Sequence, residues 1–138
     1  MKTTSFALLF GIVFLLAGIG GFVPGLSPVH MHPDVSVGAS SRLAFGLFPV
    51  NVLHNFVHLV FGLWGIVASR SISSAAGYAR AVAVIYAVLM VFGLIPRLNT
   101  LFGLVPLYGN DVWLHALLAA VAGYFGFVHR DRGDRARS

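Results

Sequence analysis

The feature that most constrains this chain is a set of long apolar stretches that carry almost no charge. They cover about residues 6–23, 50–68, 79–95 and 112–128. Each is close to the roughly 20 residues that an α-helix needs to cross the hydrocarbon core of a bilayer. Hydrophobic residues make up 58% of the 138 residues and charged residues 9%, whereas a soluble domain has about 45–50% and about 25%. We therefore expect an integral membrane protein.

The expected fold is all-α. Inside a bilayer every backbone polar group must be hydrogen-bonded within the protein, which only helices and closed barrels achieve. The chain lacks the alternating runs of about ten residues that are typical of membrane barrels. The sequence therefore predicts one domain over residues 1–138, built as a four-helix transmembrane bundle. The first stretch follows Lys2, as in a signal peptide, but we expect it to be retained as a helix.

The positions of the basic residues predict the orientation in the membrane, because Lys and Arg are retained on the cytoplasmic side. One group lies near the termini, between the second and third stretches, or at the start of the third: Lys2, Arg70, Arg80, Arg130, Arg132, Arg135 and Arg137. Only Arg42 and Arg97 lie in the other connections. Both termini are therefore expected in the cytoplasm of a multi-pass cell-membrane protein. Residues 24–49 would form an extracytoplasmic loop, and residues 129–138 a basic tail that faces anionic headgroups rather than nucleic acid.

The two halves of the sequence share three motifs in the same order. Gly-Phe-Val-Pro-Gly-Leu at 21–26 matches Gly-Leu-Ile-Pro-Arg-Leu at 93–98, and Phe-Gly-Leu-Phe-Pro at 45–49 matches Phe-Gly-Leu-Val-Pro at 102–106. The third match is the Leu-His pair that ends at His54 and at His115. This order predicts two tandem helix-hairpin repeats, related by a pseudo-twofold axis along the membrane normal. The two histidines would then face each other across that axis.

The candidate functional residues are the polar side chains inside the predicted spans. His54 and His58 lie one turn apart on one face of the second span, and His115 lies on the fourth. The same faces carry three residues that are expected to form a structural polar stripe: Asn51, Asn55 and Asp111. Because polar side chains are costly in lipid, both faces are expected to line the interior of the bundle.

The three histidines could bind a metal ion or a haem. Two imidazoles at positions i and i+4, as in His54 and His58, can chelate one ion, and His115 would add a nitrogen from the facing helix. Such a site suits Zn, Cu or Fe. A pair made of His54 or His58 with His115 could instead clamp a b-type haem between two helices. The structural alternative is hydrogen bonding across helices, which contributes about 0.6 kcal/mol on average.

The outer loop carries a weaker metal candidate, His30 and His32 on either side of Met31, a combination that suits copper. A solvent-exposed loop is the simpler expectation for these residues. No nucleophile–base pair or nucleotide-binding loop is recognisable and cysteine is absent, so the sequence does not predict an enzyme. Three hypotheses follow: a structural or accessory subunit, a haem- or metal-binding protein, or a transporter of protons or small solutes. The expected partners are the lipid bilayer and either another membrane protein or further copies of this chain.

Residues 43–65 read Leu-Ala-Phe-Gly-Leu-Phe-Pro-Val-Asn-Val-Leu-His-Asn-Phe-Val-His-Leu-Val-Phe-Gly-Leu-Trp-Gly. Together with Phe-Gly-Leu-Val-Pro-Leu at 102–107 and Asp-Val-Trp-Leu-His at 111–115, they resemble the bacterial membrane family called domain of unknown function 4383. The likeness covers nearly the whole chain, from Gly11 to about Phe127. It implies four spans and a small integral membrane protein, and it implies no activity. The His-Met-His-Pro segment at 30–33 is a departure from the family pattern.

Overall fold

The computed structural model describes residues 1–131, so most of the predicted basic tail lies outside the described residues. Within them the chain forms four α-helices: α1 (Thr3–Phe22), α2 (Val52–Ala68), α3 (Ile72–Leu94) and α4 (Asn110–Gly123). A π-helical segment, η1 (Tyr124–Val128), continues α4. Two short strands, β1 (Arg42–Ala44) and β2 (Phe48–Val50), pair antiparallel ahead of α2. The predicted all-helical character is confirmed, with this small hairpin as an addition.

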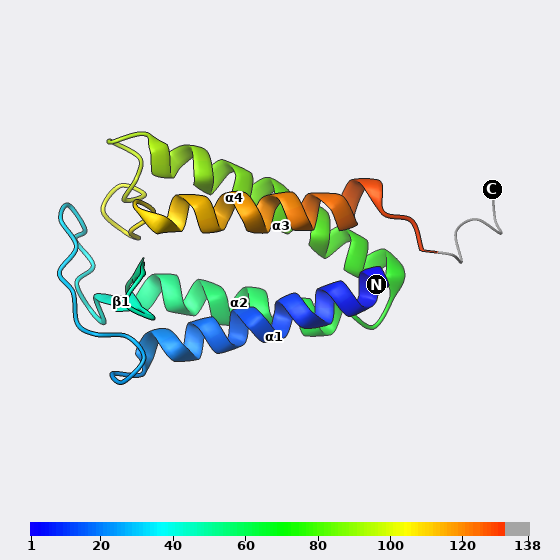
Figure 1. The fold of residues 1–138 in the computed structure, drawn as a ribbon, viewed down its shortest axis with the longest axis horizontal. Helices are drawn as coiled ribbons and strands as arrows, with labels where there is room; N and C mark the ends of the chain where they lie inside the picture. Colours follow the sequence, from blue (N-terminus) through cyan, green and yellow to red (C-terminus); the bar gives the residue numbers. More distant parts are fainter. Residues whose placement is uncertain (132–138) are drawn as a thin grey trace.

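The helices are arranged as two antiparallel pairs, α1 with α2 and α3 with α4 (Figure 1). Both described ends of the chain lie at one end of the molecule, where the Thr3 backbone N–H donates to both carboxylate oxygens of Asp131, each over 3.2 Å. We call this the terminal end. The opposite end, which we call the loop end, holds residues 23–51 and the connection 95–109 between α3 and α4 (Figure 1).

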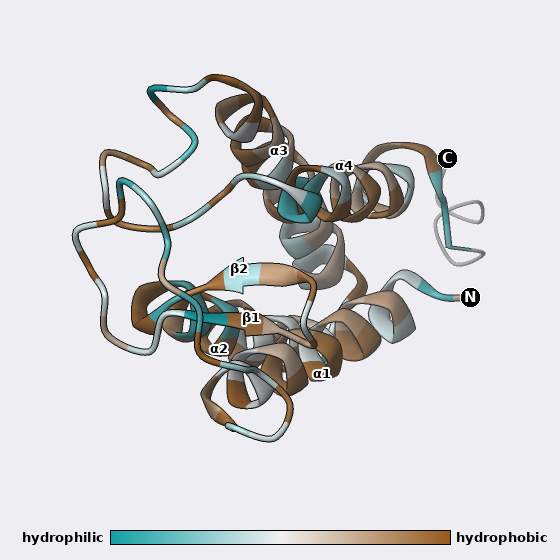
Figure 2. Ribbon diagram, turned by 60° about the vertical axis from the view of Figure 1, so that its left-hand side comes forward, coloured by the Kyte–Doolittle hydropathy of each residue, from teal (hydrophilic) through white to brown (hydrophobic). Residues whose placement is uncertain are grey.

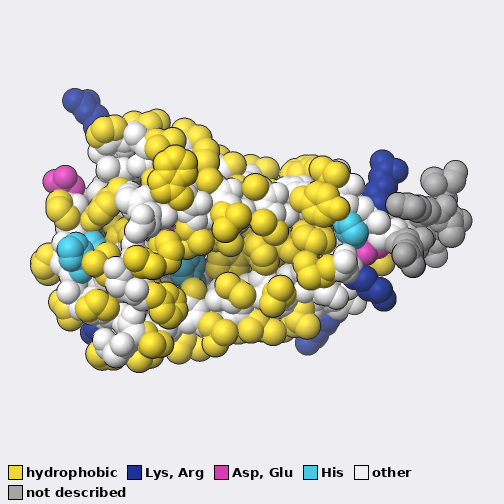
Figure 3. Space-filling view, in the orientation of Figure 1, with side chains coloured by type: hydrophobic (Ala, Val, Ile, Leu, Met, Phe, Trp, Pro, Cys, Tyr) yellow, Lys and Arg dark blue, Asp and Glu magenta, His cyan; other side chains and the backbone are white. Residues whose placement is uncertain are grey.

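In the described part of the chain, three helical segments are long and apolar enough to cross a membrane: Thr3–Phe22, Ile72–Leu94 and Asn110–Val128. The apolar helix α2 is shorter, at 17 residues, because Val50 belongs to β2 and Asn51 caps the helix. Hydrophobic residues run along the helices, and hydrophilic ones gather in the loops and at the helix ends (Figure 2). On the face drawn in Figure 3, hydrophobic side chains cover the middle of the molecule while Lys and Arg lie toward its two ends. This distribution matches the layers of a bilayer.

Glycines let α1 and α2 approach until their backbones touch. A Cβ on Gly11 would lie 2.7 Å from the backbone nitrogen of Ile66, and a Cβ on Gly65 would lie 2.8 Å from the Cα of Gly11. Real Cβ atoms essentially never come so close, so only glycine fits at these two positions. Small residues at such seams are typical of helix pairs in membranes, where close packing drives association.

Aromatic side chains join the two helix pairs. Phe6 of α1 stacks on Phe125 of η1 with 4.6 Å between ring centroids, and Phe14 of α1 lies 5.5 Å from Tyr86 of α3. All four are at least nine-tenths buried. The core is therefore a layer of aromatic rings between the pairs, closest to the terminal end at Phe6 and extending along α1.

The loop before α2 differs from the expectation of a plain exposed loop. The pairing of β1 with β2 places Arg42 opposite Val50. His32, expected in solvent, is only 6% exposed, because its Nε2 lies 3.0 Å from the carbonyl oxygens of both Arg42 and Val50. His30 is exposed, as expected, with its ring centroid 5.2 Å from that of His32. Contacts with the carbonyl oxygens at the open end of the hairpin therefore hold the His32 ring inward.

Candidate metal centre

Asn51 fixes the start of α2. Its Oδ1 accepts a hydrogen bond from the backbone N–H of His54 over 3.0 Å. Its Nδ2 donates to the carbonyl oxygens of Val37 and Leu104, over 3.0 Å and 2.7 Å. The side chain is completely buried, so it connects α2 to both connections of the loop end. The first turn of α2, which carries His54, is thereby held in place.

Asp111 and His115 lie one turn apart on α4 and are 2% and 1% exposed. His115 Nε2 lies 3.4 Å from Asp111 Oδ2. This separation is longer than the roughly 2.7–2.9 Å of a charge-assisted hydrogen bond between nitrogen and oxygen. Tyr86 of α3 packs at right angles to the His115 ring, 4.9 Å between centroids, and so limits the orientations of that ring.

His54 of α2 belongs to the other helix pair, α1 and α2, and its ring lies close to Asp111 and His115. One ligand atom each from His54, Asp111 and His115 lies within 4.8 Å of the other two. The ring centroids of His54 and His115 are 6.3 Å apart, and the ring of His58, one turn further along α2, is 4.6 Å from that of His54. We call these four side chains the His/Asp cluster.

Polar atoms of the His/Asp cluster lack hydrogen-bond partners. Within residues 1–131 the Nδ1 atoms of all three histidines and Oδ2 of Asp111 are buried without one. No Lys or Arg of this part of the chain pairs with Asp111. An unsatisfied buried polar atom costs about 1–3 kcal/mol, and an unpaired buried carboxylate costs more. Such a set of side chains is stable when a cation, a proton or water compensates it.

The donor set and its spacing fit a metal ion. Imidazole nitrogen and carboxylate oxygen bind Zn²⁺ and Fe²⁺ well. With metal–ligand bonds of about 2.1 Å, two ligands on a tetrahedral ion stand about 3.4 Å apart. His115 Nε2 and Asp111 Oδ2 have this separation, 3.4 Å. The two side chains are therefore spaced as neighbouring ligands of one ion.

The sequence also predicts a haem clamped between His54 and His115 as an alternative. The ring centroids of these two histidines are 6.3 Å apart, and the carboxylate of Asp111 has an oxygen within 4.8 Å of a ligand atom of each. The haem therefore stays a prediction beside the single ion, and an absorption spectrum distinguishes the two.

The structure gives the sequence-predicted ligands unequal positions. His54 and His115 belong to the group of three, whereas His58 lies beside His54 and outside that group. Asp111 was expected only in a structural stripe, and it is the third member. Its distance of four residues from His115, equal to that between His54 and His58, was the signal in the sequence.

Two other candidates lie apart from the His/Asp cluster. His30 and His32 are at the loop end, and the Nε2 of His32 already contacts two carbonyl oxygens. Asn55 is fully buried on α2 but faces α1, where a Cβ on Gly21 would overlap its side-chain oxygen. Neither the loop histidines nor Asn55 is therefore placed to bind the same ion.

Comparison with known proteins gives a single family. The family with the description "Domain of unknown function (DUF4383)" matches residues 4–128. No curated protein and no solved structure matches the chain. Within residues 1–131 the match covers α2, α3, α4, η1 and all of α1 but Thr3, and it includes all four residues of the His/Asp cluster.

Proposed function

The chain belongs to this family of unknown function (DUF4383), and we propose that it is a membrane protein that holds a divalent first-row metal ion between α2 and α4. The ligands are His54, Asp111 and His115, with His58 close enough to become a fourth by a rotamer change. One observation carries the proposal: three buried ligand atoms from two hairpins lie within 4.8 Å of one another.

The chemistry of the His/Asp cluster selects among metals. It contains no thiolate or thioether, the ligands that favour Cu(I). Two imidazoles and one carboxylate leave one or more coordination positions open on Zn²⁺ or Fe²⁺, which is typical of metal sites that act on or pass on a ligand. The ion would also compensate the carboxylate of Asp111, which is 2% exposed and would otherwise be an uncompensated charge in an apolar setting.

The first experiment is elemental analysis of the protein purified in detergent, together with an absorption spectrum. We expect about one zinc or iron ion per folded chain, and loss of that ion in His54→Ala and His115→Ala. His30→Ala is the matched control, because this histidine is exposed at the loop end, and it should keep the ion.

Other outcomes would identify the competing hypotheses. A Soret band lost in His115→Ala would show a haem instead of a single ion. A metal-free protein that stays folded when both His54 and His115 are replaced by Ala would overturn the proposal and favour a structural or accessory subunit. A metal-free protein with pH-dependent flux in liposomes, lost in His58→Ala, would favour transport.

We further propose that the two hairpins are copies of one unit. Support comes from the shared Phe-Gly-Leu-x-Pro motif, in which both Phe-Gly pairs have positive φ. The values are 53° and 70° at Phe45 and Gly46, and 59° and 85° at Phe102 and Gly103. A bulky residue with positive φ is rare, so its recurrence at matching positions supports a common origin.

In the same proposal all four helices cross the membrane and the terminal end faces the cytoplasm. The 17 residues of α2 span about 26 Å, close to the roughly 30 Å of a hydrocarbon core. The described basic residues at the terminal end are Lys2, Arg70, Arg80 and Arg130. Those at the loop end are Arg42 and Arg97. This excess of positive charge supports the predicted orientation.

A further inference from the structure

We propose that the headgroup phosphate of an anionic membrane lipid binds at the terminal end, in the pocket between α3, η1 and the start of α1. The pocket has a volume of about 280 Å³, and its charged lining comes from Arg80, Arg130 and Asp131. No residue of the His/Asp cluster lines it. The lipid site and the metal site therefore share no residue, and each can be tested without the other.

The π-helical segment η1 positions the first arginine. Gly126 lies directly against α3, because a Cβ there would be 2.8 Å from the backbone nitrogen of Arg80. Arg80 Nε donates to the carbonyl oxygen of Gly126 over 2.7 Å, and its guanidinium carbon lies 5.8 Å from the centre of the Phe127 ring. These contacts use one of the five N–H donors of Arg80. The four Nη hydrogens have no acceptor within residues 1–131.

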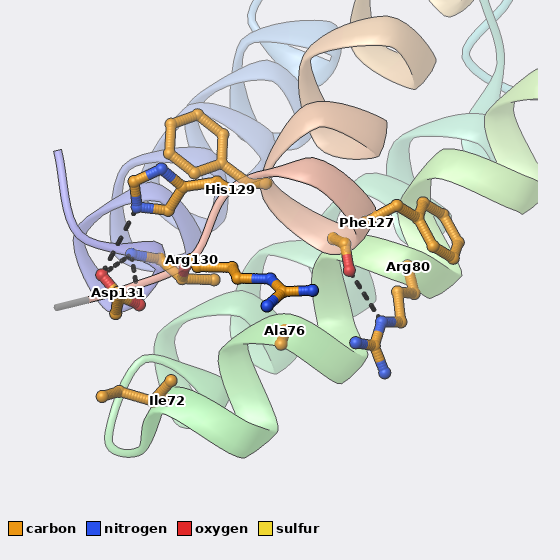
Figure 4. Close-up of a pocket in the computed structure, with 10 residues that line it drawn as sticks. Ile72, Ala76, Arg80, Phe127, His129, Arg130 and Asp131 are labelled. Carbon is orange, nitrogen blue, oxygen red and sulfur yellow. Dashed lines mark hydrogen bonds and ion pairs between the residues drawn. The ribbon is translucent and has the colours of Figure 1, made fainter. Parts of the chain in front are cut away.

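The second arginine enters the pocket from the opposite side. Figure 4 shows the Arg130 side chain extending past Ala76 toward the guanidinium of Arg80. Asp131 supplies the carboxylate among the described residues that line the pocket. Both of its oxygens accept from the Thr3 N–H at 3.2 Å, and one lies 3.5 Å from His129 Nε2. Two guanidinium groups therefore face one pocket without an anion of this part of the chain between them.

Phosphate is the anion that this arrangement fits. Guanidinium groups bind phosphate oxygens through paired N–H donors, and basic pockets between membrane helices bind anionic lipid headgroups. The rim favours a lipid over free phosphate, because Ile72 and Phe127 border the pocket and are 41% and 63% exposed. Both side chains would lie beside the first carbons of an acyl chain. The pocket also lies at the end of the membrane-crossing segment, at the depth of the headgroups.

The test counts lipids bound to the detergent-purified protein by native mass spectrometry. Phosphatidylglycerol and phosphatidylcholine with the same acyl chains are compared. We expect preferential retention of phosphatidylglycerol, reduced about fivefold by Arg80→Gln or Arg130→Gln and more by both together. Arg70→Gln is the matched control, since Arg70 is exposed at the same end but outside the pocket lining. It should change retention by less than about twofold.

Each remaining outcome has a definite meaning. Equal losses in Arg70→Gln and Arg130→Gln would show that the charge of the whole end attracts lipid, and would overturn a built site. Inorganic phosphate that displaces the lipid at equal concentration would identify free phosphate as the ligand and overturn the lipid source. Arg130 makes no hydrogen bond within residues 1–131, so Arg130→Gln should keep the helical circular dichroism of the parent. Normal lipid retention in this folded variant would also overturn the proposal.

Discussion

Asp111 is the one acidic residue within the helices of the described chain, and its role depends on residues far from it in sequence. Periodicity alone places His54, His58 and His115 on interior faces of their helices. It gives no distance between α2 and α4. The closeness of Asp111 to His54 follows from how the hairpins pack, so the sequence could indicate the ligand types but not the complete set.

Replacement of Asp111 by Asn keeps the shape of the side chain and removes its charge. We expect metal affinity to fall at least about tenfold, while the metal-free protein becomes more stable by about 1–3 kcal/mol. The gain arises because a carboxylate no longer has to be buried without a cation. Titration calorimetry and denaturant unfolding of the metal-free protein measure the two effects.

Asp34→Asn is the control for Asp111→Asn, because Asp34 is an exposed acidic residue of the outer loop. It should leave both metal affinity and stability unchanged. Lower stability of Asp111→Asn in the absence of metal would contradict the prediction. It would show instead that Asp111 serves as a hydrogen-bond acceptor in helix packing.

Through His32, the stability of the folded outer loop should depend on pH. Burial lowers the pKa of His32 below its usual value of 6.5, although hydrogen bonds with Val50 and Arg42 act in the opposite direction. The folded state therefore prefers the neutral ring, and the stability it contributes is present above the unfolded pKa and lost as pH falls toward the folded one. His32→Gln should weaken the loss of thermal stability between about pH 7 and about pH 5.

The measurement for His32 is the unfolding midpoint at each pH, supported by an NMR titration of the His32 ring. The NMR midpoint should lie below 6.5, the usual value. His30→Gln, an exposed neighbour in the same loop, serves as the control and should retain most of the pH dependence. An unchanged pH dependence in His32→Gln would mean that other groups control acid stability.

The helices and the smaller elements differ in how far the sequence determines them. Each predicted apolar stretch overlaps one helix, because a run of about 20 apolar residues leaves no other hydrogen-bonded structure in a bilayer. The strands β1 and β2 have three residues each, too few for an alternating pattern to be recognised. The segment η1, Tyr-Phe-Gly-Phe-Val, continues the apolar run that ends α4. The pocket that η1 forms around Arg80 was therefore not predictable from composition.

The seam between α1 and α2 can be tested at one glycine. Gly11→Ala should destabilise the protein by about 1–3 kcal/mol, because the new Cβ forces two helix backbones apart. The contacts that resist it are Ile66 N at 2.7 Å and the Gly62 carbonyl oxygen at 2.8 Å. Unfolding in detergent with increasing denaturant measures the change.

Gly77 provides the matched control for the α1–α2 seam. It lies within α3, and nothing would lie within 4 Å of a Cβ at this position. Gly77→Ala should be neutral or stabilise the protein by up to about 1 kcal/mol through helix propensity. Equal effects of Gly11→Ala and Gly77→Ala would show that helix propensity, and not contact between α1 and α2, determines the response.

For the molecule as a whole, the two proposed sites lie in different parts of the structure. The His/Asp cluster consists of residues of α2 and α4 and lies between the two helix pairs, nearer the loop end. The arginine pocket is at the terminal end. A metal ion in the cluster would connect the two hairpins, and a lipid at the pocket would hold α3 and η1 at the headgroups. Metal removal should therefore loosen the hairpins from each other without releasing the lipid.

The orientation of the whole chain is testable because it contains no cysteine, so a single introduced thiol is the only one. Ser36→Cys lies at the loop end and Ser73→Cys at the terminal end, and both positions are exposed. A membrane-impermeant maleimide should label Ser36→Cys in intact cells, and Ser73→Cys only after the membrane is opened. The expectation rests on the excess of Lys and Arg at the terminal end, because basic residues favour the cytoplasmic side. The reverse labelling would show the opposite topology, with the arginine pocket at the outer leaflet. Labelling of both positions in intact cells would show that the helices between them do not separate two compartments.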